Sequence, residues 1–302
     1  MRKVRRDITG ILLLDKPSGL SSNAALQTAK RAFNAAKAGH TGSLDVLATG
    51  LLPVCFGQAT KISAFLLDAD KTYTASIRLG ITTNTGDSEG EITKTAAVGP
   101  LGSEDIERAL AGLRGPIQQI PPMHSALKRN GQRLYKLAHK GIVIEREARP
   151  VTIHRLEAVA FEHECLTVEV DCSKGTYIRT LAEDIGAAIG CGAHIAALRR
   201  TRSGPFDLAD ATTLAEIRTL DERDGPENAL DALLLPVDAA LTALTALDLS
   251  EESAVCVSRG QAVRVTGAPG TGLVRLYRPG SQFIGIGTVL DDGRIAPRRM
   301  MR

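Results

Sequence analysis

The sequence has few aromatic residues, no paired cysteines and no metal-binding pattern. Only 3% of its 302 residues are aromatic and Trp is absent, so any base-stacking or sugar-stacking surface must be sparse. The five cysteines are odd in number and form no C-x-x-C pair, which argues against a disulfide framework or a zinc site. We therefore expect buried free thiols, a reducing compartment and a cytoplasmic protein without bound metal.

Long apolar segments are also missing. Residues 10–14 are apolar, but the run stops at Asp15 and Lys16 and is too short for a signal peptide. The Leu/Ala-rich run 233–247 is interrupted by Pro236 and Asp238, short of the roughly 18 residues that cross a bilayer. We expect no membrane association and, at about 150 residues per domain, about two globular domains.

Charge is unevenly distributed along the chain, although the net charge is only +3. Residues 123–155 contain eight Lys or Arg against two Glu, whereas residues 207–252 contain twelve Asp or Glu against two Arg. Such segregation suggests a surface that attracts a polyanion on one side of the molecule. Charge alone leaves open that each run is only a solvated face.

The periodicity of apolar residues predicts a mixed α+β body. Helices are expected at 21–38 and 103–113, each with a serine at its N-cap, and at 176–189 after a turn. Alternation of apolar and polar residues predicts half-buried strands at 72–79 and 166–171.

The last hundred residues change character. From Asp207 to about residue 247 the chain is acidic, rich in Ala and Leu, and expected to be helical. Short β-like runs follow, separated by Gly and Pro, at 263–265, 272–277, 283–290 and 294–297. We therefore expect a small β-rich unit after the mixed body.

The most unusual local sequence is GHTGSLDVLATGLLP at 39–53, where three Gly and two Thr surround one carboxylate, Asp45. The segment matches neither the phosphate-binding P-loop nor the dinucleotide fingerprint. Spacing alone favours a turn or helix-cap role for Asp45. A longer match changes that interpretation.

The segment closely resembles the signature G-H-T-G-x-L-D-P-x-A-x-G-L-L of the TruB family of pseudouridine synthases. The similarity spans about residues 10–205 and recurs, in the family's order, at 57–61, 70–73, 121–128, 146–150, 172–179, 190–194 and 198–200. Residues 285–299 resemble the family's PUA-type RNA-binding module more weakly. The resemblance implies a catalytic domain at 1–248, with a mainly antiparallel mixed sheet and flanking helices, and a PUA-like domain at 249–302.

The activity that the resemblance implies is isomerisation of a uridine in the T-loop of tRNA, at position 55, to pseudouridine. The N1–C1′ bond breaks, the uracil rotates, and C5 joins C1′. No group is lost and no redox change occurs, so neither a cofactor nor a metal is required. We expect a monomeric enzyme whose partner is the T-stem-loop of tRNA.

The family's catalytic residues match Asp45, Tyr73 and Arg179 in this sequence. By resemblance Asp45 is the essential aspartate, which attacks C1′ or removes a proton from C2′. Arg179 would pair with it and keep it ionised, and Tyr73 would stack on the target base. Without the resemblance, Arg179 would be interpreted as a helix-face arginine and Tyr73 as a core residue.

The resemblance also assigns the RNA contacts. Tyr73, Tyr177 and Leu198 would line the uracil pocket, and His40 would enter the T-loop beside the flipped nucleotide. In isolation Tyr177 and Leu198 would be interpreted as core residues. Contacts to backbone phosphates are expected from Lys61, Lys128, Arg129, Arg199 and Arg200.

Two positions depart from the family pattern, and two other functions remain open. Val46 stands where the family usually has proline, which frees a backbone N–H and predicts a less rigid loop. His124 stands where another aromatic is usual. One alternative is a tRNA-binding folding factor whose main role is not catalysis. The other, a carbohydrate enzyme, would need a second catalytic carboxylate near Asp45.

Overall fold

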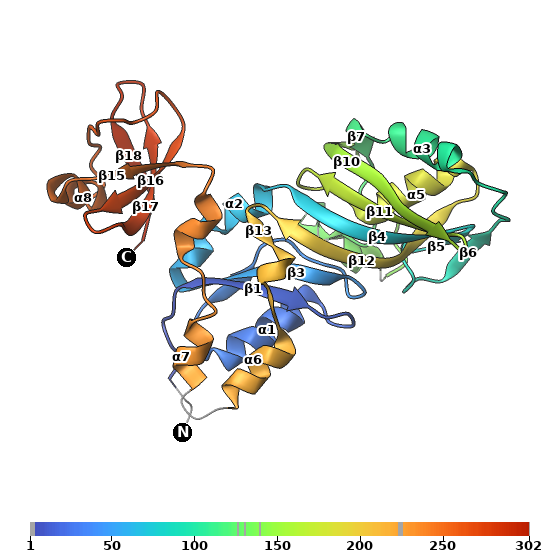
Figure 1. Ribbon diagram of the computed structural model, residues 1–302, viewed down its shortest axis with the longest axis horizontal. Coiled ribbons are helices and arrows are strands. Elements are labelled where there is room, and N and C mark those ends of the chain that lie inside the picture. The colour runs from blue at the N-terminus through green and yellow to red at the C-terminus, as the bar shows by residue number, and fades with distance from the viewer. Residues whose placement is uncertain (1–3, 126, 130, 139, 223–225, 302) are drawn as a thin grey trace.

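Two β-sheets of very different size organise the computed structural model in Figure 1. The structure describes residues 4–125, 127–129, 131–138, 140–222 and 226–301. A ten-stranded sheet forms the body, and a four-stranded sheet forms a separate unit at the C-terminal end. Two short hairpins complete the strands, β5 (Ile81–Thr83) with β6 (Ile92–Thr95) and β8 (Lys128–Arg129) with β9 (Gln132–Arg133).

The large sheet is mixed and mainly antiparallel, as expected. Neighbouring strands are antiparallel except in two pairs, β1 with β14 and β3 with β12. In addition to the main path, β2 (Ala38–His40) pairs with β3 and β13 (Phe206–Asp207) with β12. The spatial order is β14 (Thr212–Thr213), β1 (Gly10–Lys16), β3 (Thr49–Phe56), β12 (Ala193–Ser203), β4 (Lys71–Leu79), β11 (Cys165–Cys172), β10 (Arg149–Glu162) and β7 (Gly115–Gln119).

Helices flank this sheet. In the half that contains β1 and β3 they are α1 (Ser22–Ala32), α2 (Ser63–Asp68), α6 (Leu214–Asp221) and α7 (Pro226–Asp231). In the other half, α3 (Ser103–Ala111) and α5 (Ile178–Ile189) pack on each other and on β10 and β12. Short 3₁₀ turns connect the elements at η1 (Gly57–Ile62), η2 (Leu208–Asp210) and η3 (Val237–Leu241).

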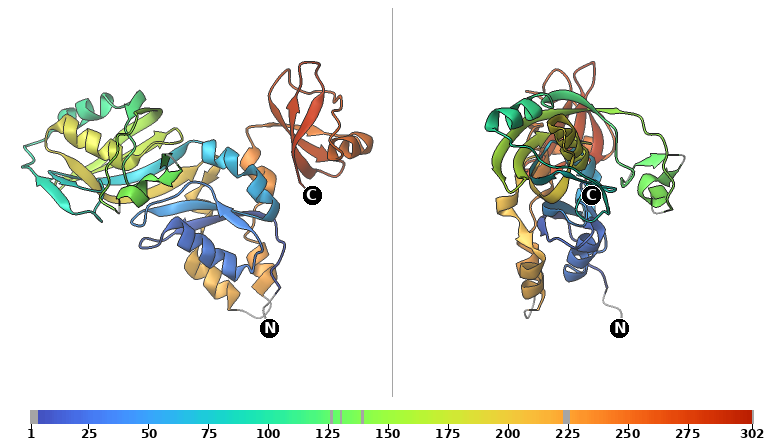
Figure 2. Two further views of the ribbon diagram at one scale, coloured as in Figure 1. Left: turned by 180° about the vertical axis from the view of Figure 1, so that it is seen from behind. Right: turned by 90° about the vertical axis from the view of Figure 1, so that its right-hand side faces the viewer.

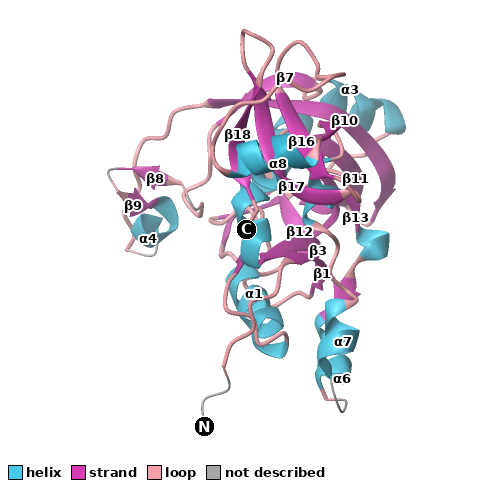
Figure 3. Ribbon diagram, turned by 90° about the vertical axis from the view of Figure 1, so that its left-hand side faces the viewer, coloured by secondary structure: helices cyan, strands magenta, loops and turns pink. Residues whose placement is uncertain are grey.

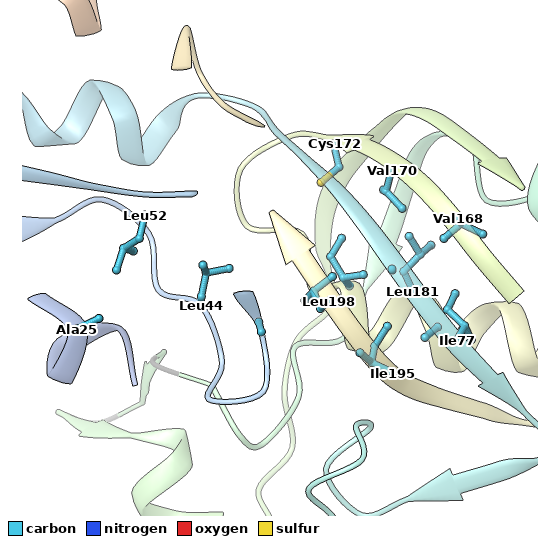
Figure 4. Packing of buried hydrophobic residues seen from close by; sticks show 14 of the residues in the cluster. Ala25, Leu44, Leu52, Ile77, Val168, Val170, Cys172, Leu181, Ile195 and Leu198 are labelled. Atoms are coloured by element: carbon cyan, nitrogen blue, oxygen red, sulfur yellow. The ribbon is translucent and has the colours of Figure 1, made fainter. Parts of the chain in front are cut away.

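One apolar core continues through both halves of the body. Figure 4 shows Leu44 between the Ala25 and Leu52 side chains on one side and the Leu181 and Leu198 side chains on the other. Leu44, at 5% exposed, directly precedes Asp45 in sequence. The buried leucine therefore anchors the segment that carries the conspicuous carboxylate.

The segment β8–β9–α4 (α4, Leu134–Ala138) stands away from the large sheet (Figures 2 and 3). Residues 120–125, which precede this segment, lie against the body, where the His124 carbonyl accepts a hydrogen bond from Arg179 of α5. The β8–β9–α4 segment contains much of the basic run at 123–155.

The four-stranded sheet has a core of its own. Its order is β15 (Thr245–Asp248), β16 (Leu273–Arg278), β17 (Gln282–Val289) and β18 (Ile295–Met300), with α8 (Glu251–Ser258) packed beside it. The β-like run at 263–265 forms only an isolated bridge, between Val263 and Ile295. The unit is joined to the body by an apolar contact of Ile286 and by a hydrogen bond of 2.6 Å from the Tyr277 hydroxyl to Asp238.

Three expected helical boundaries were wrong. The first helix ends at Ala32 rather than Ala38, because Asn34 takes a positive φ of 47° and residues 38–40 pair with β3. Gly102, not Ser103, is the N-cap of α3, and its N–H donates to the Asp105 carboxylate. In place of continuous helix, the described residues in 207–247 contain two short α-helices, α6 and α7, two 3₁₀ turns and short strands.

Candidate active site

Asp45 lies on a loop between β2 and β3 that is held from two sides. The Ser22 hydroxyl donates to the Leu44 carbonyl at 2.9 Å and accepts from the Leu44 N–H at 2.7 Å. The Lys16 ammonium, fully buried, donates to the carbonyls of Pro17 and Leu20 and, at 3.3 Å, to that of Val46. The loop is therefore fixed on both sides of Asp45, whose own side chain keeps 40% of its surface exposed.

Arg179 meets Asp45 with a two-point contact. Its Nε lies 3.0 Å from Asp45 Oδ2, and its Nη2 donates to Oδ1 at 3.3 Å. The guanidinium comes from the first turn of α5, and its side chain is only 6% exposed. Two carbonyls, of Thr85 at 2.9 Å and His124 at 2.8 Å, accept its remaining N–H groups. The catalytic pair expected from the sequence is thus brought together, with a fixed orientation.

The ionisation of Asp45 is set by opposing effects. Burial raises the pKa of the Asp45 carboxyl most strongly, and the nearby charge of Asp87 raises it further. The Arg179 guanidinium opposes this rise through its charge and its hydrogen bond. The Asp45 carboxylate is therefore held by its ion pair with Arg179 while its side chain stays 40% exposed.

Asp87 is the site residue that sequence reasoning missed. It is 4% exposed and its Oδ2 lies 3.7 Å from Arg179 Nη1, on the guanidinium that also binds Asp45. The Thr85 hydroxyl donates to Asp87 Oδ1 at 2.6 Å, and the Glu89 N–H donates to the same oxygen. In sequence Asp87 stands in a Thr-Gly-Asp-Ser stretch typical of a solvent-exposed turn, so no local signal marks it.

The two tyrosines come from β4 and from the start of α5. Tyr73 is partly buried on β4 and packs against the main core. Tyr177 precedes α5 as its N-cap, and the buried Gln119 side chain holds its backbone N–H at 3.0 Å and its carbonyl at 3.3 Å. Burial raises the pKa of both phenols, and the charge of Asp45 adds to the rise in each.

Leu198 and His40 are the other two residues expected to contact the nucleotide and the T-loop. Leu198 is 7% exposed on β12 and belongs to the same core as Leu44. His40 ends β2, four residues before the buried Leu44, and burial lowers the pKa of its imidazole, helped by the charge of Arg200. Among the described residues, its Nδ1 has no hydrogen-bond partner.

The expected phosphate contacts have different surroundings. Arg199 is 43% exposed and pairs with Asp15 at 2.7 Å. The Lys61 ammonium donates to the Met300 carbonyl at 2.7 Å, in a cleft of about 1100 Å³ between η1 and β18 that Arg298 and Arg299 also line. The side chains of Lys128 and Arg129 lie outside what the structure describes.

The structure contradicts the phosphate contact that the sequence analysis predicted for Arg200. The sequence analysis expected it to contact phosphate, but its side chain is 1% exposed and cannot reach an RNA backbone. On a strand, successive side chains point to opposite faces, so Arg199 and Arg200 could not both face the RNA. Their adjacency in the sequence concealed that difference.

Neither a cluster of metal-ligating side chains nor a membrane-spanning helix occurs in the described ranges. Over these residues, no cluster of three or more His, Cys, Asp or Glu side chains could hold a metal ion. None of the helices in the same ranges is long and apolar enough to cross a membrane.

Comparison with known proteins covers the whole chain. The family model described as TruB family pseudouridylate synthase (N terminal domain) matches residues 30–178. Models described as tRNA pseudouridylate synthase B C-terminal domain and Pseudouridine synthase II TruB, C-terminal match 179–242 and 245–301. A Pseudomonas aeruginosa (strain UCBPP-PA14) protein named tRNA pseudouridine synthase B is 57% identical, covering 100% of this chain and 99% of that protein. The chain belongs to the TruB family of pseudouridylate synthases.

Other relatives agree with this membership of the TruB family and with the fold. A protein of the same name from Pseudomonas putida (strain GB-1) is 56% identical and covers 100% of this chain and 98% of its own length. A chain of a Cbf5-Nop10-Gar1 complex superposes with a TM-score of 0.74 at 27% identity, covering 97% of this chain and 84% of that chain. A chain of an H/ACA RNP bound to a substrate RNA containing 2′-deoxyuridine has the same fold, with a TM-score of 0.72 at 23% identity, covering 97% of this chain and 85% of that chain.

Proposed function

We propose that the chain isomerises a uridine in the T-loop of tRNA, at position 55, to pseudouridine. The observation that carries this proposal is the contact between Asp45 and Arg179. A carboxylate that is 40% exposed, yet gripped at two points by a buried guanidinium, is poised to react with a bound sugar. Membership in the TruB family, at 57% identity to a protein named tRNA pseudouridine synthase B, supports the reaction and the tRNA substrate.

The chemistry follows from these groups. The target uridine leaves its stack, and its base lies against the Tyr73 ring beside Leu198, where apolar walls exclude water. Asp45 then acts on the ribose, either by attack on C1′ or by taking the C2′ proton, and the N1–C1′ bond breaks. The uracil leaves with the electrons of the N1–C1′ bond and rotates, and C5 bonds to C1′ as the Asp45–C1′ bond breaks or, on the second route, as Asp45 returns the C2′ proton. The C5 proton is then lost and N1 gains a proton, so the product is an isomer of the uridine.

Binding and chemistry are assigned to different parts of the chain. Arg199, the projecting β8–β9–α4 segment and the basic cleft at Lys61 would contact RNA phosphates, and His40 would enter the opened T-loop. We further propose that residues 249–302, together with β15, act as the RNA-binding module. The enzyme would work as a monomer in the cytoplasm, where its five free cysteines stay reduced.

The two alternatives are less well supported. A folding factor without catalysis would not require a buried arginine to orient a half-exposed carboxylate. A carbohydrate enzyme would use two carboxylates that both face the sugar. The second carboxylate here, Asp87, is 4% exposed and is bound by the opposite end of the Arg179 guanidinium, so it is not available to a substrate.

The test is tritium release from unmodified tRNA that carries 5-tritiated uridine. We expect wild type to release one tritium per tRNA, and Asp45→Asn to release none while binding tRNA within about 3-fold of wild type. A tRNA with cytidine in place of the T-loop uridine is the control and should release nothing. Tritium release from that control would disprove the T-loop uridine as the site of modification. Tight tRNA binding by wild type without tritium release would favour the tRNA-binding folding factor.

A further inference from the structure

Arg200 occupies an unusual position for an arginine. It is the largest of the fully buried side chains in the described part of the chain. Its strand, β12, lies between β3 and β4, and in the strand register Arg200 pairs with Gly50 on one side and Tyr73 on the other. The residue thus sits between the Asp45 loop and the strand that carries the tyrosine.

The Arg200 guanidinium binds both ends of the Asp45 loop. Its Nε donates to the Leu51 carbonyl at 2.6 Å, and its Nη2 donates to the Gly42 carbonyl at 3.1 Å. These two carbonyls flank residues 43–50, which contain the reacting aspartate. Because the guanidinium is planar and rigid, it fixes the separation of the two loop ends in a way that a single ammonium cannot.

Arg200 also lies beside Tyr73. The two residues are paired in the register of β12 with β4, and the positive charge of Arg200 opposes the rise that burial causes in the pKa of the Tyr73 phenol. One rigid group therefore holds the loop that carries Asp45 and stands next to the residue expected to face the target base.

The backbone near Arg200 is also closely packed. A Cβ added at Gly50, where φ is 99°, would lie 2.3 Å from the Arg200 carbonyl oxygen, so only glycine allows this approach. The loop and β12 are thus in direct contact through both backbone and side chain.

Burying this charge is costly for stability. The guanidinium donates to two carbonyl oxygens rather than to a carboxylate, so its desolvation is offset only by dipoles. An apolar side chain of similar volume would serve the core at least as well. The arrangement is better explained by its geometry than by a contribution to stability.

We propose that Arg200 is a positioning residue, which fixes the Asp45 loop against the strands that pair at Tyr73, so that Asp45 and Tyr73 meet the flipped nucleotide in one geometry. It touches neither RNA nor the reacting atoms. The inference rests on the proposed isomerisation, because a positioning role has meaning only if Asp45 reacts.

The test compares Arg200→Lys with the same substitution at Arg202, an exposed residue two positions further along β12. Lysine keeps the charge but replaces the planar guanidinium by a single ammonium, which cannot hold the two loop ends at one fixed separation. We expect Arg200→Lys to lower the single-turnover rate at saturating tRNA between about 10- and 100-fold, with the tRNA Kd within about 3-fold of wild type. Arg202→Lys should change neither quantity.

A double-mutant cycle with Tyr73→Phe supplies a measurement that a general structural defect would not reproduce. If Arg200 acts partly through the phenol, the combined loss in Arg200→Lys/Tyr73→Phe should be smaller than the product of the single losses. Fully multiplicative losses would overturn the proposed link to Tyr73.

Other outcomes are equally decisive. Arg200→Lys should not keep a normal rate at saturating tRNA while it binds tRNA more weakly, with the slope of log Kd against log salt reduced by about one. That result would restore the phosphate-contact role of Arg200 and overturn the inference. Arg200→Gln, which removes the buried charge, is made in parallel. If neither variant folds, judged by thermal melting, Arg200 is a structural residue and the proposal is wrong. An inactive wild type would instead refute the proposed function.

Discussion

The Asp45 region and the β8–β9–α4 segment differ in nearly every physical respect. Around Asp45, buried side chains from distant parts of the chain converge, and Lys16, Arg179 and Arg200 each bind several backbone carbonyls. The β8–β9–α4 segment extends away from the sheet (Figure 3), and the loop that precedes it contacts Arg179 through the His124 carbonyl. Chemistry needs positions fixed within fractions of an ångström, whereas phosphate contacts tolerate movement.

The comparison therefore predicts two kinds of variant. Substitutions in the centre, meaning Asp45 and the residues that hold it, should lower the rate and leave RNA affinity nearly unchanged. Substitutions at the periphery, meaning the exposed residues proposed to contact phosphate, should weaken RNA affinity and leave the rate at saturating tRNA unchanged. The predictions below run from the largest expected effect to the smallest.

Arg179→Gln should have the largest effect. Loss of the two-point contact frees Asp45 to rotate, and we expect the single-turnover rate to fall about 100- to 1000-fold. Because Arg179 lowers the pKa of Asp45, the acidic limb of the pH–rate profile should move to higher pH. An unchanged limb in rapid-quench measurements would mean that the two groups are not coupled as described.

Asp87→Asn should have a smaller effect, about 10-fold on the rate, because it removes one of the contacts that hold the Arg179 guanidinium. The acidic limb of its pH–rate profile should shift in the direction opposite to that expected for Arg179→Gln. The charge of Asp87 raises the pKa of Asp45, so its removal should move the acidic limb to lower pH. A shift to higher pH would contradict this arrangement of charges.

Arg199→Gln should act on affinity alone. A half-exposed arginine that contacts phosphate contributes mainly counterion release, so we expect the Kd for tRNA to rise about 3- to 10-fold. The slope of log Kd against log salt should fall by about one, measured by filter binding between 50 and 200 mM salt. A lower rate at saturating tRNA would place this residue with the central group instead.

Tyr277→Phe should have the smallest effect. It removes the hydrogen bond to Asp238 that joins the four-stranded unit to the body, which is worth about 1 kcal/mol. Urea unfolding should show this loss, with no change in the rate. Phe283, whose ring packs against Tyr277, keeps an aromatic neighbour in the variant and limits the change to the hydroxyl.

Much of this site was accessible from the sequence because it depends on local pattern. The strand at Tyr73 followed from alternation, and the segment around Asp45 matched a family signature. The end of α1 was missed because a non-glycine residue, Asn34, adopts a left-handed backbone. Asp87 could not be found, because its burial depends on a guanidinium 92 positions away in the sequence.

Arg200 shows a different kind of failure. Adjacent basic residues were given the same role, although the alternation that identified other strands would have placed them on opposite faces of β12. The strand was not recognised at 193–203, so that argument was not made. The contacts of Arg200 with Gly42 and Leu51 join residues about 150 positions apart and required the fold.

One paired measurement tests the separation of centre and periphery most directly. Single-turnover pseudouridine formation and tRNA Kd are measured for Asp45→Asn and Arg199→Gln beside wild type. We predict that Asp45→Asn loses all detectable turnover with a Kd within about 3-fold of wild type, and that Arg199→Gln weakens binding with a normal saturating rate. Turnover by Asp45→Asn, or a parallel loss of rate and affinity in both variants, would contradict the account.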